Sequence, residues 1–354
     1  MSNKSAKRNK ARRNKEKRDR DELRAANEYE DTASATSTSG AGPSSASGIN
    51  YLTEEPCLFE VRSIPGKDLG LVATADIPKG TRILKEAPLL VVKLGKPVQI
   101  EAAVSAAIQS FGPWKKKALL GLYNCHRDTK YKLHGIFVTN ALPRGEGAGA
   151  VFEYISRINH SCRPNSHICW NDNLGMETVH AIRTISSGEE ITINYGHTGV
   201  SEERQAWLKK RFKFDCACEV CGLGQRQLRA SDSTRRRIRD LTDALHRSLS
   251  VPHIPVNIDT IRQNYLDVQE LIKGEFGPDC AMRAEIYELA YDIAVLEGRQ
   301  FHAERQAQAA YDIRVVAQGY DHPDAEEILK TMCDPVSDPC FGVCAPKPRN
   351  GRDQ

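Results

Sequence analysis

The chain has 354 residues, 40% of them hydrophobic, which is enough to bury a substantial core and excludes a minimal peptide. Its net charge of +4 is uneven, because residues 1–24 carry eleven Lys or Arg against four Asp or Glu, a local excess of +7 that leaves about −3 for the rest. No apolar run of about eighteen residues occurs, and no apolar stretch follows the basic start, which argues against a membrane span or a secretory signal. We therefore expect an intracellular protein, in the nucleus or the cytoplasm, whose cysteines are thiols or metal ligands.

The basic start is compatible with two roles. In the first, the tract at residues 7–18 binds nucleic acid or an import receptor, since clustered cations gain from releasing counterions held by phosphates. In the second, it is a solvated tail with no targeting function. Residues 32–48 are almost entirely Ser, Thr, Ala and Gly, a composition that cannot offset its ordering entropy. We predict a disordered basic tail and linker at residues 1–50 and a second disordered tail at 347–354.

The first half of the chain has the pattern of short strands. Runs rich in β-branched and apolar residues alternate with turn residues such as Pro-Gly and Pro-Lys-Gly, which favours an antiparallel β domain. The runs expected to be strands are 58–61, 71–74, 82–84, 89–92, 136–139, 167–170, 178–182 and 190–194. Residues 99–111 and 114–123 have helical spacing. We predict a mostly antiparallel β domain over residues 51–215, with a small helical insert at about 97–132.

The second half has the pattern of long helices. A helix is predicted over 201–212, with Ser201 as N-cap and Glu202 and Glu203 favourably placed in the first turn. Further helical patterns cover residues 233–249, 257–273, 280–297 and 301–318. We interpret the arginine run at 235–237 as a solvated helix face and His322-Pro323 as a turn between helices without a chemical role. The fold class is therefore α+β, with an all-helical C-terminal domain at residues 227–346.

A cluster of cysteines predicts a metal site. Cys216, Cys218 and Cys221 offer three thiolates within six residues, and a tetrahedral zinc site needs a fourth ligand. Cys162 is the natural candidate, because it ends an Asn-His-Ser-Cys sequence. Coincidental buried thiols are the alternative. We predict zinc bound by these four cysteines, with residues 216–226 as the zinc-binding segment.

The order of several motifs resembles a known family. The motifs are KDLGL at 67–71, NHSCRPN at 159–165, GEEITINY at 188–195 and FKFDCACEVC at 212–221. In this order they resemble SET-domain protein-lysine methyltransferases, and most of all the SET-and-MYND (SMYD) type, over about residues 59–221. The helical C-terminal part is loosely similar to the TPR-like domain of that type. The separate MYND zinc finger is absent, since residues 93–133 contain only Cys125 and His126.

The resemblance implies a function and a set of site residues. It implies transfer of methyl groups from S-adenosylmethionine to lysine side chains of a protein, with Tyr195 as the catalytic residue and a post-SET zinc that closes the channel wall. Phe214 would stack on the adenine. The residues that the resemblance places at the cofactor are Lys67, Leu69, Gly70, Asn140, Ser156, Asn159, His160, Tyr195 and Phe214.

Three functions remain open at this point. The first is a methyltransferase, acting as a monomer on a histone or non-histone protein that binds in a groove beside the SET core. The second is a weakly active or inactive SET-fold scaffold, and the third is a basic-tailed nucleic-acid binder in which zinc only stabilises the fold. The joint presence of Asn159, His160, Tyr195 and Phe214 favours the first, although Tyr195 alone would fit a strand-end aromatic that covers the core.

Overall fold

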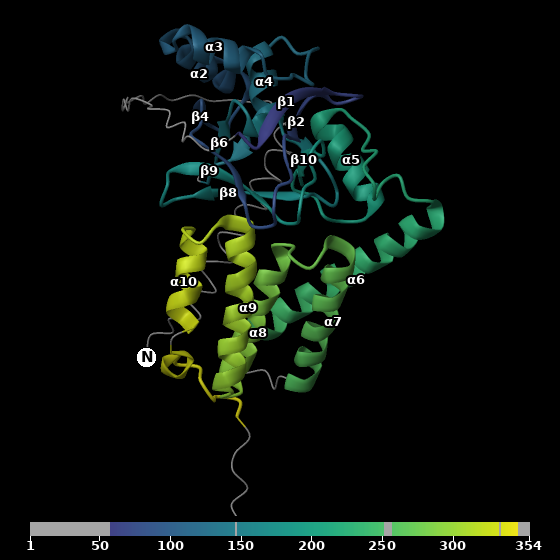
Figure 1. Cartoon of the computed structure of the whole chain (residues 1–354), viewed down its shortest axis with the longest axis vertical. Coiled ribbons are helices and arrows are strands. Elements are labelled where there is room, and N and C mark those ends of the chain that lie inside the picture. The colour runs from purple at the N-terminus through teal and green to yellow at the C-terminus, as the bar shows by residue number, and fades with distance from the viewer. Residues whose placement is uncertain (1–56, 146, 251–256, 333, 346–354) are drawn as a thin grey trace, which may run out of the picture.

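The computed structural model describes residues 57–145, 147–250, 257–332 and 334–345. The predicted tails at residues 1–50 and 347–354 lie outside the described residues. Short strands and the helices α2 to α5 occupy one part of the molecule, and helices α6 to α10 pack beneath them (Figure 1). None of the described helices combines the length and the apolar character that a membrane crossing requires.

The strands form three small sheets. Their bounds are β1 Phe59–Ile64, β2 Asp68–Ala73, β3 Arg82–Glu86, β4 Leu90–Lys93, β5 Leu142–Pro143, β6 Ala148–Val151, β7 Asn159–His160, β8 Ser166–Asn171, β9 Met176–Ala181 and β10 Glu190–Ile193. The strand orders are β1-β2-β10-β7, β3-β9-β8 and β4-β6-β5. These pairs are antiparallel except β7 with β10, in which Asn159 lies opposite Thr192 and His160 opposite Ile193. The predicted antiparallel β domain is confirmed, and its one parallel pair sets the Asn-His motif beside the strand that leads to Tyr195.

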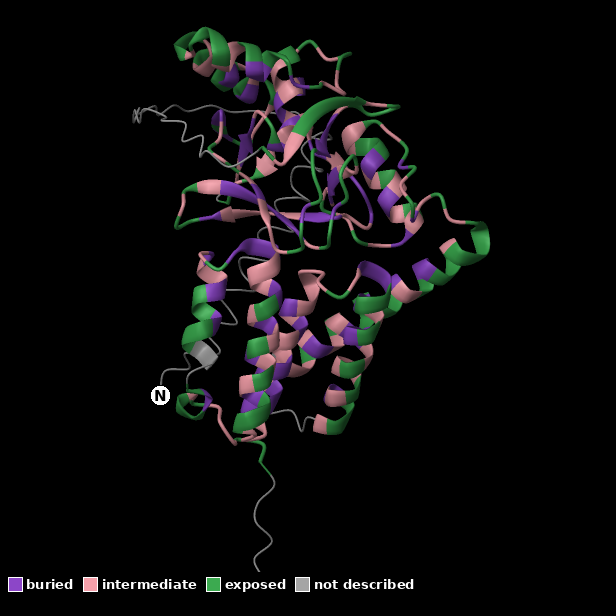
Figure 2. Ribbon diagram, viewed as in Figure 1, coloured by how far each residue is buried: buried purple, intermediate pink, exposed green. Residues whose placement is uncertain are grey.

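Strand β10 shows how the sequence pattern builds this core. Side chains alternate along a strand, so Ile191 and Ile193 enter the main apolar cluster, which includes the fully buried Phe152. Thr192 points to the opposite face, and its N–H donates to Asn165 Oδ1 at 2.8 Å. Most of the strands carry buried residues, which are purple in Figure 2. The strand before Tyr195 is therefore fixed from both faces.

The helical insert consists of α2 Pro97–Ser110, α3 Pro113–Leu120 and α4 Lys132–Asn140. Helices α2 and α3 both start with proline, which suits the first helical position because its missing N–H has no partner there anyway. In the segment where the SMYD type would carry its MYND finger, Cys125 and His126 contact the carbonyl of Arg211. The predicted insert is present, but one more helix belongs to it than the sequence indicated.

The strand predicted at residues 136–139 is wrong, because this segment is the second half of α4. Its β-branched and aromatic residues suggested a strand, yet Phe137 is fully buried in a cluster with residues of α2 and α3. Thr139 Oγ1 donates to the Gly135 carbonyl at 2.7 Å, and Asn140 Nδ2 donates to the Ile136 carbonyl at 2.7 Å. Tertiary packing and bonds one helical turn back thus outweigh β propensity.

The remaining helices are α5 Ser201–Phe212, α6 Gln225–Ser250, α7 Ile258–Phe276, α8 Met282–Leu296, α9 Gln300–Gln318 and α10 Pro323–Met332. The helical C-terminal region is confirmed, although α6 starts earlier than predicted and no range was predicted for α10, the helix that follows the turn at His322-Pro323. Ser201 is not the N-cap. It is the first residue of α5, after Val200, and its N–H and Oγ donate to the Asp232 carboxylate at 2.6 and 2.5 Å.

The interpretation of residues 235–237 as a solvated face is wrong for Arg235. Its relative exposure is 3%, whereas Arg236 and Arg237 are exposed. Arg235 precedes Ile238 by three positions, on the face of α6 that also buries Leu241. Spacing of three and four places residues on one helix face, so the arginine enters the interior with its apolar neighbours.

The connection between helices α9 and α10 is attached to the β domain by polar contacts. Asp321, between α9 and α10, pairs with Arg82 of β3 and accepts from Asn171 Nδ2 of β8 at 3.2 Å. His322 contacts the Trp170 carbonyl at 3.2 Å. His322-Pro323 does lie at the junction of two helices, as predicted, but it also joins the helices to the sheet.

Candidate active site

The four predicted cysteines converge on one point. Cys162 follows β7, and Cys216, Cys218 and Cys221 follow α5. Their sulfur atoms all lie within 4.8 Å of one another, with Cys162 Sγ 4.0 Å from Cys216 Sγ and 3.6 Å from Cys221 Sγ. A tetrahedral ion with bonds of about 2.3 Å would hold its sulfur ligands about 3.8 Å apart. The cluster therefore fits a metal ion, and it is the only group of this kind in the described part of the chain.

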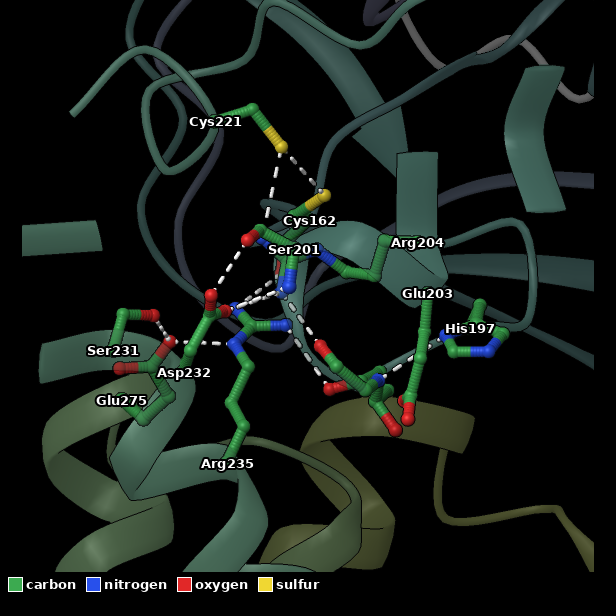
Figure 3. Close-up of polar contacts among 12 residues, drawn as sticks. Cys162, His197, Ser201, Glu203, Arg204, Cys221, Ser231, Asp232, Arg235 and Glu275 are labelled. Carbon is green, nitrogen blue, oxygen red and sulfur yellow. Dashed lines mark hydrogen bonds and ion pairs between the residues drawn. The ribbon is translucent and has the colours of Figure 1, made fainter. Parts of the chain in front are cut away.

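A buried arginine lies beside the sulfur atoms (Figure 3). The side chain of Arg204, in α5, has 1% exposure, and its Nη2 lies 3.6 Å from Cys221 Sγ. Nη1 donates to the Gly199 carbonyl at 2.6 Å and lies 3.8 Å from the carboxylate of Asp232. Hydrogen bonds among the four thiols, foremost from Cys162, lower the pKa of Cys218 and Cys221 and leave that of Cys162 and Cys216 raised. Arg204 also lowers the pKa of Cys221, so the thiolate, the form that binds metal, is favoured at Cys218 and Cys221.

His160 connects the cysteine cluster to Tyr195. Burial lowers the pKa of His160 to about 4, so the ring is neutral at pH 7. Its Nδ1 accepts the backbone N–H of Tyr195 at 3.1 Å and must be unprotonated to do so. The proton is then on Nε2, which lies 3.3 Å from Cys162 Sγ. The ring is therefore held at both nitrogens and has no side-chain polar atom left for a ligand.

Tyr195 stands at the end of β10 in an aromatic setting. Its hydroxyl donates to the Ile158 carbonyl at 2.9 Å, and its ring centroid lies 4.7 Å from that of Phe212. Burial raises the pKa of Tyr195 well above its ordinary value, so the phenol keeps its proton at neutral pH. Phe214 also lies near His160, with 6.3 Å between the ring centroids. The structure thus brings His160, Tyr195 and Phe214 together.

The residues predicted around Gly70 meet Asn159 through a shared carboxylate. Asn159 Nδ2 donates to the Leu69 carbonyl at 3.2 Å and to Glu190 Oε1 at 2.9 Å, while Lys67 Nζ pairs with Glu190 Oε2 at 2.6 Å. A Cβ atom added to Gly70 would lie 2.7 Å from Asn159 Nδ2, closer than real contacts allow. Only glycine therefore lets strand β2 approach Asn159 this closely.

Asn140 and Ser156 form a separate pair. Ser156 Oγ donates to the Asn140 carbonyl at 3.0 Å and accepts the Phe152 N–H at 2.9 Å. The side-chain amide of Asn140 is bonded to the carbonyls of Tyr123 and Ile136. Within the described residues, no hydrogen bond joins this pair to Asn159 or His160. Their side chains therefore shape the backbone at the start of the segment that leads to Asn159.

Sequence reasoning missed the polar residues behind this site. Arg204, Asp232, Arg235 and Glu275 are all largely buried and link the cysteine cluster to helices α6 and α7 (Figure 3). A signal was present for two of them, since Asp232 and Arg235 occupy the same face of the helical pattern as Ile238. Their charge concealed it, because charged residues are rarely buried unless paired.

Comparisons with known proteins agree with this geometry. The family model described as SET domain matches residues 68–196. Histone-lysine N-methyltransferase set5 of Schizosaccharomyces pombe is 38% identical over 192 residues, which are 53% of this chain and 56% of that protein. Histone-lysine N-methyltransferase SMYD1 of Homo sapiens is 34% identical over 116 residues, 29% of this chain and 22% of that protein. Protein-lysine N-methyltransferase SMYD4 of Mus musculus is 38% identical over 78 residues, which are 21% of this chain and 9% of that protein. The chain thus spans about half or less of the length of these relatives.

Proposed function

We propose, from the premise that residues 68–196 form a SET domain, that this protein is an S-adenosylmethionine-dependent methyltransferase acting on lysine side chains of a protein substrate. The observation that carries the proposal is the parallel pairing of β7 with β10, which sets the Asn159-His160 motif against the strand that leads to Tyr195. The names of the matched relatives, which are histone-lysine and protein-lysine methyltransferases, support the same activity.

The reaction makes modest chemical demands on the protein. S-adenosylmethionine, when bound, supplies a methyl group whose bond to sulfur breaks as the neutral lysine amine forms the new N–C bond, leaving S-adenosylhomocysteine and a proton for solvent. The protein has to align the two reactants in line, and orientation alone can supply several kcal/mol. It must also admit a neutral amine, although the reference pKa of lysine is about 10.4. Burial of the lysine side chain beside Tyr195, away from water, would disfavour the ammonium form and so assist the loss of its proton.

In this proposal Tyr195 orients the reacting groups and does not accept a proton. Its hydroxyl is held by the Ile158 carbonyl, and burial raises its pKa, so a phenolate is not available at neutral pH. The hydroxyl oxygen and the Ile158 carbonyl oxygen then present two fixed acceptors at one place. Such a pair suits an amine and a polarised methyl group, both of which carry partial positive charge on hydrogen.

The residues near Asn159 fit the proposed cofactor. Both N–H groups of the Asn159 amide are used inside the protein, and Oδ1 accepts no hydrogen bond from the described residues, so it remains for the ammonium of the methionine part. Phe214 offers a ring to the adenine, while His160 would contribute backbone atoms because both ring nitrogens are engaged. Lys67, Leu69 and Gly70 would border the methionine end. Asn140 and Ser156 would act through the backbone that they hold.

We assign zinc to Cys162, Cys216, Cys218 and Cys221. Four thiolates leave no open coordination position, so the ion would be structural. It would fix the segment after α5 and so hold Phe212 and Phe214 near Tyr195. Because four thiolates outweigh the two positive charges of the ion, the buried guanidinium of Arg204 would offset part of the remaining negative charge.

The predicted organisation is a SET domain at residues 51–215 with its insert at about 97–132, a zinc segment at 216–226 and a TPR-like helical domain at 227–346. The proposed organisation keeps these parts, with the insert continued to Asn140 and the helical domain begun at Gln225, because α4 and α6 have those bounds. The substrate would be a histone or another protein of the nucleus or cytoplasm, bound beside the SET core. Incubation of the purified protein with methyl-labelled S-adenosylmethionine and a hypomethylated cell extract tests the activity. We expect labelled extract proteins. Cofactor binding without any labelling would instead favour the inactive scaffold.

A further inference from the structure

Arg235 of α6 reaches out of the helical domain into the backbone around the candidate site. Its side chain has 1% exposure, and its Nε donates to Glu275 Oε1 of α7 at 2.7 Å. The two other nitrogens donate to main-chain carbonyls, Nη1 to Thr198 at 3.1 Å and Nη2 to Cys162 at 3.3 Å (Figure 3). One guanidinium thus joins α7 to two separate segments of the SET part.

Those two segments flank the pair that the proposed reaction uses. Cys162 lies two residues after His160, and Thr198 lies three residues after Tyr195. Backbone pairing between β7 and β10 ends close to this point, since Ser161 N–H donates to the Ile193 carbonyl at 2.9 Å. Beyond the strands, the Arg235 fork connects the two segments in addition to the bond from the Tyr195 N–H to His160 Nδ1.

We propose that Arg235, anchored by Glu275, is a positioning residue of the methyl-transfer site: it fixes the carbonyls of Cys162 and Thr198 and thereby the spacing of His160 and Tyr195. The inference rests on the proposed function and adds to it that the helical domain supplies part of the catalytic framework. Arg235 does not touch the reacting groups in this proposal. It acts through the backbone that carries them.

The anchor itself is built for a fixed geometry. Glu275 Oε1 also accepts Ser231 Oγ at 2.6 Å, and the Glu275 carbonyl accepts Arg163 Nε at 2.7 Å. The Arg235 guanidinium lies 4.5 Å from the ring centroid of Phe276. Each end of the connection is therefore held by several contacts, one of them from the residue that follows Cys162. A lysine at position 235 would keep the charge but would lose the planar fork that reaches three acceptors in fixed directions.

The test compares Arg235→Lys and Glu275→Gln with the wild type in the full-length protein. Arg236→Gln is the matched control, since it removes a neighbouring arginine that is exposed on the same helix. Calorimetric titration gives the Kd for S-adenosylmethionine, and the absorption bands of Co²⁺-substituted protein report the geometry of the four sulfurs without turnover. Both measurements are made at a temperature below the onset of thermal unfolding of each variant. Loss of a residue that supports a site typically lowers affinity or activity by about 10–100-fold. We therefore expect the Kd for S-adenosylmethionine to rise by about 10–100-fold in Arg235→Lys and Glu275→Gln, with an altered Co²⁺ spectrum. In the control Arg236→Gln, the Kd should change by less than about twofold.

Unchanged Kd and Co²⁺ spectrum in folded Arg235→Lys and Glu275→Gln would overturn the proposal and leave Arg235 with a role in stability alone. If Arg235→Lys does not fold, Glu275→Gln decides by the same criterion, because it retains the shape of the anchor. A wild-type protein that does not bind S-adenosylmethionine would count against the proposed function instead, and the Co²⁺ spectra of the variants would still decide whether Arg235 positions the Cys162 segment.

Discussion

Replacing Gly70 by alanine should damage the site more than the fold. The new Cβ would lie 2.7 Å from Asn159 Nδ2, 2.8 Å from Ile64 Cγ1 and 3.1 Å from Glu190 Oε1, where ordinary contacts begin at about 3.4 Å. Relief of about 0.7 Å requires the Asn159 amide to move away from the Leu69 carbonyl and Glu190. The loss of two hydrogen bonds at about 1 kcal/mol each, together with overpacking at about 1–3 kcal/mol, gives a free-energy cost of about 3–5 kcal/mol.

Calorimetric titration and thermal unfolding separate the two effects of this change. We expect the variant to remain folded with a lowered Tm and to bind S-adenosylmethionine at least about tenfold more weakly, because Asn159 is displaced from its proposed place at the cofactor. Gly112→Ala is the control, since Gly112 has ordinary negative φ and no atom within 4 Å of an added Cβ. Wild-type affinity in folded Gly70→Ala would refute the placement of Asn159 at the cofactor.

Two further changes test other parts of the account. Cys216→Ser removes a ligand, so zinc measured by atomic absorption should fall from about one ion per chain to a small fraction, with a lower Tm; full zinc content would contradict the assigned site. Burial raises the pKa of Glu86 to about 7, despite N–H groups donated by the backbone at residues 153–155, so its folded form binds a proton more tightly than the unfolded chain. Stability should then fall as pH rises from about 4.5 to 7, by up to about 3 kcal/mol, and Glu86→Gln should flatten this slope in urea titrations; an unchanged slope would refute the assignment.

Local patterns in the sequence account for much of the fold. Strand β10 and helix α5 follow from alternation and from acids in the first turn, because the decisive interactions lie within a few residues. The error at α4 has a different cause. Ile136, Phe137 and Val138 have the side chains of a strand, and the helix is stabilised because Phe137 packs into an apolar cluster with residues of β4, α2 and α3. No local pattern contains that information.

The site divides in the same way. Resemblance located Asn159, His160 and Tyr195, and the structure places them together. Arg235 was interpreted as solvated because its burial depends on Glu275, forty residues further along the chain, which supplies the opposite charge. Helical spacing alone placed the arginine on the inner face of α6, but only the folded structure shows the partner that makes a charge tolerable there.

The central claim is that Tyr195 directs methyl transfer to lysine. Wild type, Tyr195→Phe and the exposed control Tyr320→Phe are incubated with methyl-labelled S-adenosylmethionine and hypomethylated extract, and the acid-hydrolysed proteins are separated by chromatography. The account predicts label in methylated lysine for wild type and Tyr320→Phe, and a loss of about a hundredfold or more for Tyr195→Phe with cofactor binding retained, because a fixed hydrogen-bonding group at the reacting atoms is removed. Label at the wild-type rate in Tyr195→Phe, or label in amino acids other than lysine, would contradict it.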